Sequence, residues 1–465
     1  MNATELQIVR TPSLLADAPH VPVLIVGAGA CGMTAAIGLR ERGIECVLVE
    51  RDALPQGSTA LSSGFIPAAG TRLQKSLGIT DSRETFAQDV QAKAHGDAAP
   101  QLVEAYIRAV AQAIDALEQH HGIVFEVLDG FLYPGHRARR MHAVPEHTGA
   151  ALMACLQRAV SAAGADILTD ALVRVLYIDA DDRVLGIGCT RPDGALETLA
   201  CDVLLLACNG YGGNAAMVRE LLPEMGEAIF AGHVGNDGSA IQWGRELGAR
   251  LADLGGYQGH GSWVVPQGAL MSWAVMMQGG VQINTEGRRF HDETLGYSEA
   301  AVHVLAQPGS VAFNVFDTPL LELARTFPDY LDAEKAGALR TADSLEDLAQ
   351  LIGCAPAMLR ETLAEVAPAH VDGFGRRFQR VLQPPYHVVR VTGALFHTQG
   401  GLDIDASCRV LHLDGAPFAN LLAAGGAARG VSGNAVWGYL SGNGLLSAVG
   451  GGWLAAETAA KLLQR

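Results

Sequence analysis

Three glycines near the start of the chain, Gly27, Gly29 and Gly32, have the spacing GxGxxG. They follow the apolar run Val21–Val26, which predicts a buried strand, and they open a run of small residues that predicts a helix. Glu50 ends the next expected strand, eighteen positions after Gly32. In such a βαβ unit the glycines let the backbone approach a pyrophosphate, and the acidic residue accepts from ribose hydroxyls. The spacing therefore predicts a Rossmann unit that holds the adenosine half of a dinucleotide.

Three later parts of the chain could return to the same cofactor, because each combines glycine or hydroxyl residues with a close approach of the backbone. The loop Ser58–Gly64 follows the second strand and is rich in hydroxyl groups. An apolar strand runs into Asn209-Gly210, and a C-terminal return comprises Leu421–Gly426 and Ser441–Leu445. Three separate chain segments that come back to the cofactor suit a molecule of the length of FAD better than a nicotinamide cofactor, so we predict FAD.

The composition is that of a globular protein with more than one domain. The chain has 465 residues, 49% of them hydrophobic, and a formal charge of −16. An acidic chain repels phosphate backbones and anionic lipids, so nucleic acid and membrane surfaces are unfavourable partners. No apolar run reaches the roughly 20 residues of a membrane span, and the N-terminus lacks a secretory pattern, so a cytoplasmic location is expected. The eight cysteines are scattered without a CxxC pair, which favours reduced buried thiols and no metal or haem site.

The order of the expected elements is that of an α/β domain interrupted by a second domain. Residues 255–383 change character, with several prolines and a surface helix pair, and we predict that they are inserted between residues 1–254 and 384–465 of the first domain. The expected strands are Val21–Val26, Glu45–Val49, Ala171–Ile178, Arg183–Cys189 and Leu196–Cys208. The expected helices are the one that follows Gly32 and ends at about Arg42, those within 81–121, and Thr148–Ala163, Ser344–Ile352, Pro356–Ala367 and Trp453–Leu463.

At these residues the chain resembles the fumarate reductase and succinate dehydrogenase flavoprotein superfamily. The resemblance runs from about Val21 to the C-terminus and also includes Gly238–Asp253, Asn284–Glu293 and His397–Gly425. It implies an α/β fold in which a discontinuous Rossmann-type FAD-binding domain carries an inserted α+β capping domain. It also implies an FAD-dependent oxidoreductase that acts on a CH–CH bond next to a carbonyl of a small-molecule substrate.

The chain departs from the superfamily members that act on dicarboxylates. Those members carry an arginine after the RF-x-x-E motif, where this chain has Tyr297, and a second one in the C-terminal segment, where Ser432–Gly444 has none. A substrate with two carboxylates needs two arginines, each of which binds one carboxylate through two hydrogen bonds. A fumarate-like substrate is therefore not expected. Tyr297 and Tyr439 are similar instead to a tyrosine pair of the ketosteroid dehydrogenase branch and related cyclic-ketone desaturases. Histidines remain at two substrate-facing positions of the superfamily, His260 and His397.

Desaturation of a ketone needs a polarised carbonyl, a base for the α-proton and a hydride acceptor, which FAD supplies. The resemblance assigns carbonyl polarisation to Tyr439 with the backbone N–H of Asn443, and proton transfer to Tyr297. His260 and His397 are expected to line the substrate pocket, and a separate acceptor is expected to take the electrons. One alternative is an enoate or fumarate-type reductase that uses the two histidines as anchors. Another is a flavoprotein whose FAD is structural or serves non-redox chemistry such as hydration. The sequence does not indicate an oligomeric state.

The motifs and the resemblance together predict which residues contact FAD. Covalent members of the superfamily have a flavin-linking histidine where this chain has serine and threonine in Ser58–Ser62, so FAD is expected to bind non-covalently. In the superfamily an acidic residue that contacts FAD often follows the Ala-Ala-Gly of the C-terminal segment. This chain has Gly426 at that position, so that contact is missing. The predicted contacts are Gly27, Gly29, Ala30, Cys31, Gly32, Glu50, Arg51, Ser58, Thr59, Ser62, Ser63, Gly64, Val173, Cys208, Asn209, Gly210, Asp237, Gly425, Gly426, Asn443, Gly444 and Leu445.

Overall fold

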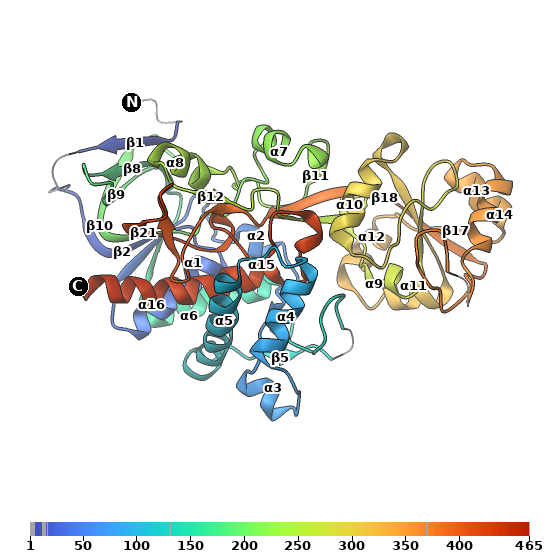
Figure 1. Ribbon diagram of the computed structural model, residues 1–465, viewed down its shortest axis with the longest axis horizontal. Helices are drawn as coiled ribbons and strands as arrows, with labels where there is room; N and C mark the ends of the chain where they lie inside the picture. The colour runs from blue at the N-terminus through green and yellow to red at the C-terminus, as the bar shows by residue number, and fades with distance from the viewer. Residues whose placement is uncertain (1–4, 12–14, 16, 130–131, 369–370, 465) are drawn as a thin grey trace. The chain divides into compact units, whose positions relative to one another are not determined.

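The computed structural model describes residues 5–11, 15, 17–129, 132–368 and 371–464, which form two compact units (Figure 1). Unit 1 consists of the chain up to Leu221, Gly232–Tyr257, and the chain from His397 onward. Unit 2 consists of Leu222–Ala231 and Gln258–Phe396. None of the helices in the described part of the chain combines the length and the apolar character that spanning a bilayer requires.

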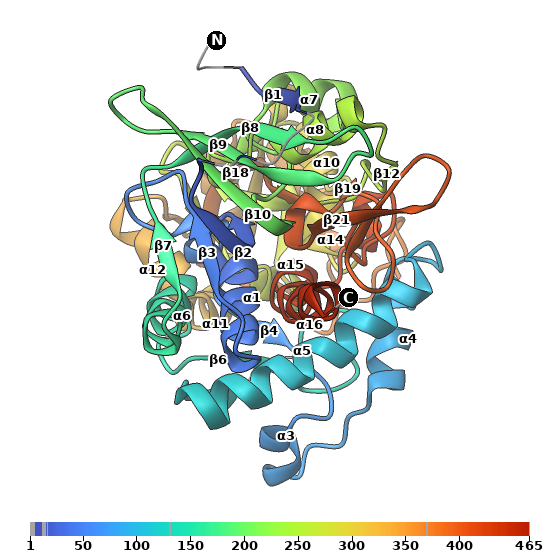
Figure 2. The ribbon, with the colours of Figure 1, turned by 90° about the vertical axis from the view of Figure 1, so that its left-hand side faces the viewer.

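Five parallel strands form the centre of a nine-stranded sheet in unit 1 (Figure 2). Their order is β21 (Pro417–Ala423), β10 (Leu196–Leu206), β2 (His20–Val26), β3 (Cys46–Val49) and β7 (Asp166–Leu168). In register, Val26 and Ala423 both stand beside Leu206. The chain segments that follow β2, β10 and β21 therefore leave the sheet next to one another, and this brings three distant glycine-containing segments to one place.

The remaining strands of unit 1 extend this sheet or form small sheets of their own. The large sheet also contains β1 (Gln7–Arg10), β8 (Leu172–Ile178), β9 (Val184–Thr190) and β20 (Arg409–Leu411). β8, β9 and the first half of β10 form an antiparallel meander, and β1 joins β8 in parallel. The small sheets contain β4 (Ile66–Pro67), β5 (Glu126–Val127), β6 (Met141–Ala143), β12 (Leu251–Ala252) and β19 (Gly401–Leu402).

Small residues allow the first helix of unit 1 to pack closely on its neighbours. α1 (Ala30–Glu41) is buried from Ala30 to Leu39 and packs against α16 (Gly451–Leu463) and α6 (Gly149–Ala163) (Figure 2). A Cβ atom at Gly38 would lie 3.0 Å from the Cβ of Ala456, so glycine is needed for this approach. The other helices are α2 (Gly57–Ala60), α3 (Arg72–Ser76), α4 (Arg83–Lys93), α5 (Pro100–His121), α7 (Ala215–Leu221), α8 (Ser239–Leu247) and α15 (Asn443–Leu445).

Unit 2 is built on a seven-stranded sheet in which the long strand β18 pairs with several partners. Its strands are β11 (Ile229–Phe230), β13 (Tyr257–Val264), β14 (Ala269–Leu270), β15 (Val281–Ile283), β16 (Ala312–Asp317), β17 (Arg340–Ala342) and β18 (Tyr386–Thr398). Its helices are α9 (Ala274–Met277), α10 (Tyr297–Leu305), α11 (Thr318–Ala324), α12 (Pro328–Lys335), α13 (Leu345–Ile352) and α14 (Pro356–Ala364).

The predicted α/β fold with a Rossmann-type sheet is confirmed, and the differences lie at boundaries. The sequence assigned residues 384–396 to the returning part of the first domain. In the structure β18 pairs with β16 and belongs to unit 2 as far as Phe396. Leu222–Ala231 also belong to unit 2, because β11 pairs with β18. Strand β10 ends at Leu206 and not at Cys208, since the chain turns at Asn209, whose φ is 66°.

Candidate cofactor and active site

The turn between β2 and α1 has the geometry that its three glycines predict. Gly27 has a φ of +105°, and a Cβ atom there would lie 2.5 Å from the carbonyl oxygen of Ala207. A Cβ atom at Gly32 would lie 2.0 Å from the carbonyl oxygen of Gly27. These positions accept only glycine, and the tight turn leaves the N-terminus of α1 open to an anion.

The Glu50 carboxylate is fixed at the end of β3. Its Oε2 accepts from the backbone N–H of Ala28 at 2.9 Å, and its Oε1 accepts from that of Asp52 at 3.1 Å. Glu50 is buried. Each carboxylate oxygen can accept a second hydrogen bond, so the orientation is suited to the two hydroxyls of a ribose.

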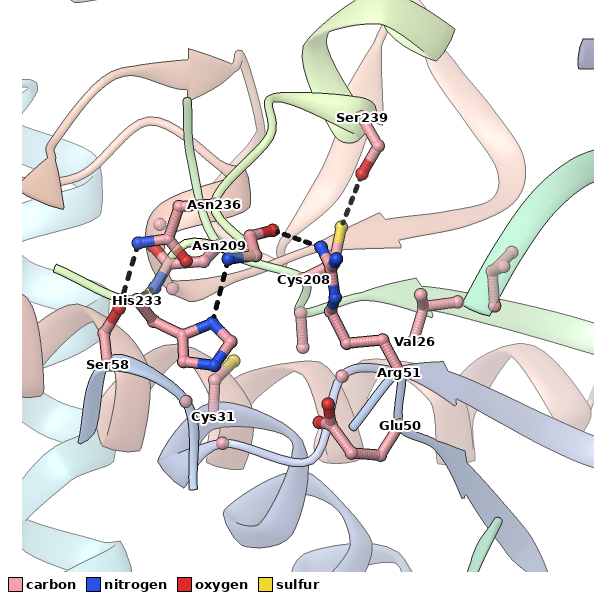
Figure 3. A pocket seen from close by; sticks show the side chains of 18 of the residues that line it. Val26, Cys31, Glu50, Arg51, Ser58, Cys208, Asn209, His233, Asn236 and Ser239 are labelled. Atoms are coloured by element: carbon pink, nitrogen blue, oxygen red, sulfur yellow. Dashed lines mark hydrogen bonds between the residues drawn. The ribbon is translucent and has the colours of Figure 1, made fainter. Parts of the chain in front are cut away.

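A pocket in unit 1 lies over this turn and is bounded by the segments that follow β2, β3, β10 and β21 (Figure 3). The predicted FAD contacts that line it are Gly27, Gly29, Ala30, Cys31, Glu50, Arg51, Ser58, Thr59, Val173, Cys208, Asn209, Asp237, Gly425 and Gly426. The predicted contacts outside its lining are Gly32, Ser62, Ser63, Gly64, Gly210, Asn443, Gly444 and Leu445. Residues that the sequence analysis missed also line it, chiefly Gly57, His233, Gly235, Asn236, Ser239 and Trp243.

The missed residues of the loop His233–Asp237 are held against the end of β3 (Figure 3). Arg51 donates to the carbonyl oxygen of Gly235 at 3.0 Å, and His233 Nε2 lies 3.0 Å from Asp52 Oδ2. The loop carries no motif of its own, and its partners lie more than 180 positions away in sequence, as the span from Arg51 to Gly235 shows. The one signal in the sequence that could have indicated this loop is its run of small and polar residues just before a helix.

Ser58 has a hydroxyl oxygen that accepts two hydrogen bonds. Asn209 Nδ2 donates to it at 3.0 Å, and Asn236 Nδ2 donates at 2.9 Å. With both lone pairs occupied, the hydroxyl hydrogen is directed to a third partner and can donate to a phosphate oxygen. Thr59 Oγ1 accepts from the backbone N–H of Ala30 at 3.2 Å, which fixes the loop to the start of α1.

The second half of the same loop packs against the start of α6. Ser62 Oγ donates to the carbonyl oxygen of Thr59 at 2.7 Å and accepts from the N–H of Gly64 at 3.1 Å. A Cβ atom at Gly64 would lie 2.8 Å from the carbonyl oxygen of Thr148. Ser62 and Gly64 therefore fix the shape of the loop against the start of α6 through these local bonds and this close packing.

Two cysteines line the pocket as thiols. Burial raises the pKa of Cys31 to about 12 and that of Cys208 to about 12. Ser239 Oγ donates to Cys208 Sγ at 3.8 Å. Thiols with such pKa values are protonated at neutral pH, so neither side chain is a nucleophile.

Trp243 Nε1, Asn443 Oδ1 and Ser447 Oγ are among the buried polar atoms of unit 1 that have no hydrogen-bond partner in the described part of the chain. Trp243 lines the pocket, and Asn443 and Ser447 lie in the glycine-rich C-terminal segment. Leaving a polar atom buried without a partner is costly, so these positions fit a bound molecule with its own donors and acceptors. Within the described ranges, no group of three or more His, Cys, Asp or Glu side chains could hold a metal ion.

His397 and Tyr439 form an aromatic pair in unit 1. Their ring centroids are 5.5 Å apart and the planes cross at 72°. Burial lowers the pKa of His397 to about 4 and raises the pKa of Tyr439 above its usual value, so both groups are neutral near pH 7. A Cβ atom at Gly444 would lie 2.8 Å from the His397 ring, so this pair requires glycine there.

The backbone amide of Asn443 has a hydrogen-bond partner within the chain. The backbone N–H of Asn443, which the resemblance aimed at a ketone, donates to the carbonyl oxygen of Leu440 at 3.0 Å. The turn that starts α15 therefore uses this amide. The N–H groups of Gly442 and Gly444 interact with the Tyr439 hydroxyl instead.

His260 and Tyr297 form a second aromatic pair, in unit 2. Their rings stack with centroids 4.9 Å apart and planes 17° apart, and Trp273 meets His260 edge-on at 5.8 Å. The backbone N–H of Ser262 donates to His260 Nδ1 at 3.1 Å. Burial lowers the pKa of His260 to about 3, so the ring is neutral with its proton on Nε2.

The arginine of the RF-x-x-E motif has a structural role in unit 2. Arg289 donates to Glu293 at 2.6 Å and also pairs with Asp372. Arg376 pairs with the same Glu293 at 2.5 Å. All four side chains are buried, so the cluster neutralises its own charges and anchors the segment that leads to Tyr297.

These features define a flavoprotein fold of the Rossmann type. The chain belongs to the FAD binding domain family, whose sequence profile matches residues 22–445. It is 28% identical over 445 residues to the probable fumarate reductase Ifc3 of Shewanella frigidimarina, covering 94% of this chain and 74% of the relative. It is 22% identical to 4-oxocyclohexanecarboxylate 2-dehydrogenase of Sinomonas cyclohexanicum, covering 87% of each chain.

Solved structures share this fold. A flavocytochrome c3 fumarate reductase in its open conformation has a TM-score of 0.82 and 26% identity, covering 97% of this chain and 80% of that one. A 3-ketosteroid dehydrogenase of Rhodococcus jostii has a TM-score of 0.78 and 23% identity, covering 97% and 99%. The predicted superfamily and its cofactor, FAD, are confirmed. The protein is an FAD-dependent oxidoreductase of a family that acts on CH–CH and C=C bonds.

Proposed function

We propose that this protein desaturates a cyclic ketone between the α- and β-carbons. FAD, bound non-covalently, supplies the hydride acceptor for the β-carbon. The chain's own groups bind the carbonyl, take the α-proton and keep the site free of cationic side chains. The electrons then pass to a separate acceptor.

The observation that carries this proposal is the absence of positive charge on the four predicted substrate groups. His260 and His397 are neutral because burial lowers their pKa values, and the other two groups are the phenols Tyr297 and Tyr439. A neutral set of donors suits a ketone oxygen better than a carboxylate, which binds best to a guanidinium fork.

Three arginines, Arg289, Arg376 and Arg429, support the same conclusion, because each is already paired with a carboxylate. Arg289 pairs with Glu293 and Asp372, and Arg376 pairs with Glu293. Arg429, next to the C-terminal glycine-rich segment, donates to Asp253 at 2.6 Å and 3.1 Å. A substrate carboxylate would have to compete with these internal partners. The relative that acts on 4-oxocyclohexanecarboxylate, a cyclic ketone, also supports this substrate class.

We assign carbonyl polarisation to Tyr439. Burial raises the pKa of its phenol, which keeps the hydroxyl hydrogen available for donation. The hydrogen bond stabilises the charge that develops on the carbonyl oxygen and so acidifies the α-hydrogen. Tyr297, reacting as a phenolate, is the proposed acceptor of that proton and becomes a phenol, and His397 and His260 act as Nε2–H donors that orient the substrate.

The test is an anaerobic titration of the purified holoenzyme with cyclic ketones, followed by flavin absorbance. The panel is cyclohexanone, 4-oxocyclohexanecarboxylate and a 3-ketosteroid, with succinate as a saturated dicarboxylate. We expect bleaching and a stoichiometric enone with at least one ketone and none with succinate. Flavin that stays oxidised with every ketone, while succinate bleaches it, contradicts the proposal.

A second candidate function is reduction of an enoate, favoured by the 28% identity to a probable fumarate reductase. The discriminating measurement starts from dithionite-reduced holoenzyme. Rapid reoxidation by fumarate, urocanate or acrylate, faster than by any cyclic enone, favours this direction. Conversion of any substrate with no change in flavin absorbance favours the third candidate, non-redox chemistry.

A further inference from the structure

We infer that Gln399 is a positioning residue that holds His397 in its neutral, Nε2-protonated form and thereby selects an uncharged carbonyl over a carboxylate. The selection of a carbonyl rests on the proposed function. The state of the histidine does not, because it follows from the hydrogen bonds of unit 1 alone.

Four side chains of unit 1 form a continuous row of hydrogen bonds that ends at His397. Asn443 Nδ2 donates to Ser432 Oγ at 2.9 Å, and Ser432 Oγ donates to Gln399 Oε1 at 2.9 Å. Gln399 Nε2 then lies 3.1 Å from His397 Nδ1. Asn443, Ser432 and Gln399 are buried, so water does not compete for these bonds.

With Asn443 Nδ2 as the atom that faces Ser432, each later bond in the row has one possible direction. An amide nitrogen only donates, so the Ser432 oxygen accepts from Asn443 and turns its own hydrogen toward Gln399. Gln399 must therefore present its oxygen to Ser432 and its NH₂ group to the imidazole. His397 Nδ1 can only accept from that group, and the ring proton is placed on Nε2.

The Thr398 carbonyl oxygen competes with Gln399 for His397 Nδ1, but at a longer distance. The carbonyl oxygen of Thr398 lies 3.4 Å from His397 Nδ1 and would require a proton on that nitrogen. Such a proton would face the Gln399 NH₂ group at 3.1 Å, hydrogen against hydrogen. The shorter bond from Gln399 decides the tautomer.

With the proton on Nε2, the N–H group of His397 lies near Gly444, and a second donor, the Tyr439 hydroxyl, is close to the same residue. A Cβ atom built on Gly444 would lie 2.8 Å from His397 Nε2 and 3.6 Å from the Tyr439 hydroxyl. Two neutral donors therefore converge near Gly444. A ketone oxygen can accept from both, whereas a carboxylate would lose its hydration without gaining a positive partner.

Substitution of Gln399 by glutamate reverses the tautomer with little change in size. A carboxylate only accepts, so His397 must carry a proton on Nδ1 in Gln399→Glu, and the new charge raises its pKa. Gln399→Leu keeps the bulk but gives Nδ1 no donor. Gln101→Glu, on the exposed side of α5, is the matched control.

The first experiment is a long-range ¹⁵N–¹H correlation spectrum of holoenzyme labelled with ¹⁵N-histidine, with His397 assigned by its loss in His397→Gln. We expect a neutral Nε2–H ring in the wild type and in Gln101→Glu from pH 6 to pH 8, and a proton on Nδ1 in Gln399→Glu. A wild-type ring with its proton on Nδ1, or an imidazolium at pH 7, overturns the inference. The wild-type spectrum alone suffices if the variant does not fold.

The second experiment measures kcat/KM with the best ketone of the titration panel. We expect a loss of about 10-fold to 100-fold in Gln399→Leu and Gln399→Glu at unchanged FAD content, and no change in Gln101→Glu. Unchanged kcat/KM in Gln399→Leu overturns the role of Gln399 in selection. If no ketone is oxidised, the proposed function fails, and the spectrum still decides the state of His397.

Discussion

His260 and Tyr297 stack ring on ring, 4.9 Å apart, a contact that does not involve the Tyr297 hydroxyl group. Tyr297→Phe should therefore keep the packing of unit 2 and lose the proposed proton acceptor. We expect full FAD content and a fall in the rate of flavin reduction by ketone of about 10²-fold to 10⁴-fold, measured by stopped flow. Tyr386→Phe, a buried tyrosine of the same unit, is the control and should react at the wild-type rate. Wild-type reduction by Tyr297→Phe would remove this residue from the mechanism.

Gly444 is the residue that permits His397 and Tyr439 to meet. In Gly444→Ala the new methyl group would lie 2.8 Å from the His397 ring, so the imidazole must move. We expect kcat with the ketone to fall about 10²-fold, because catalysis depends on placement within about 1 Å. Gly373→Ala is the control, since a Cβ atom there meets nothing within 4 Å and the φ angle is not positive. FAD content is measured in both variants, and a fall confined to FAD content would place Gly444 in cofactor binding only.

The Glu50 carboxylate accepts from two backbone amides, so Glu50→Gln must turn an NH₂ group toward one of them. We expect the Kd for FAD to rise at least tenfold, which corresponds to about 1.4 kcal/mol. The measurement is quenching of flavin fluorescence when FAD is titrated with the apoprotein. Glu45→Gln, an exposed acid just before β3, should bind FAD like the wild type. Equal affinity of the Glu50→Gln variant would mean that the carboxylate does not contact the ribose.

His142 makes the stability of the protein depend on pH. Burial lowers its pKa from 6.5 to about 4, so between these values the unfolded chain binds more protons than the folded one. Stability is therefore unaffected above pH 6.5 and is lost as the pH falls toward 4. The loss from this group between pH 7 and pH 5 is about 1–2 kcal/mol. In His142→Gln the difference in unfolding free energy between pH 7 and pH 5 should shrink by that amount, as measured by urea denaturation. Gln101→Asn, which changes no titratable group and lies at an exposed position, should leave the difference unchanged.

The sequence by itself determined the parts of this protein that depend on local backbone demands. The turn from Gly27 to Gly32 needs glycine for reasons that lie within a few residues, and Glu50 follows at a distance that one helix and one strand fix. The elements of the βαβ unit and the superfamily could therefore be predicted. The tyrosines at positions 297 and 439 were visible as residue types, but their partners were not.

Only the tertiary structure decided which groups are available for chemistry. The amide of Asn443 belongs to a turn with Leu440, the loop His233–Asp237 reaches the pocket through Arg51, and the tautomer of His397 depends on Gln399. A hydrogen bond has one direction and one partner, and that partner is chosen by the packing of segments that lie far apart in the chain. Spacing along the sequence therefore predicts where a cofactor binds, while the protonation and orientation of the groups around it follow from the folded contacts.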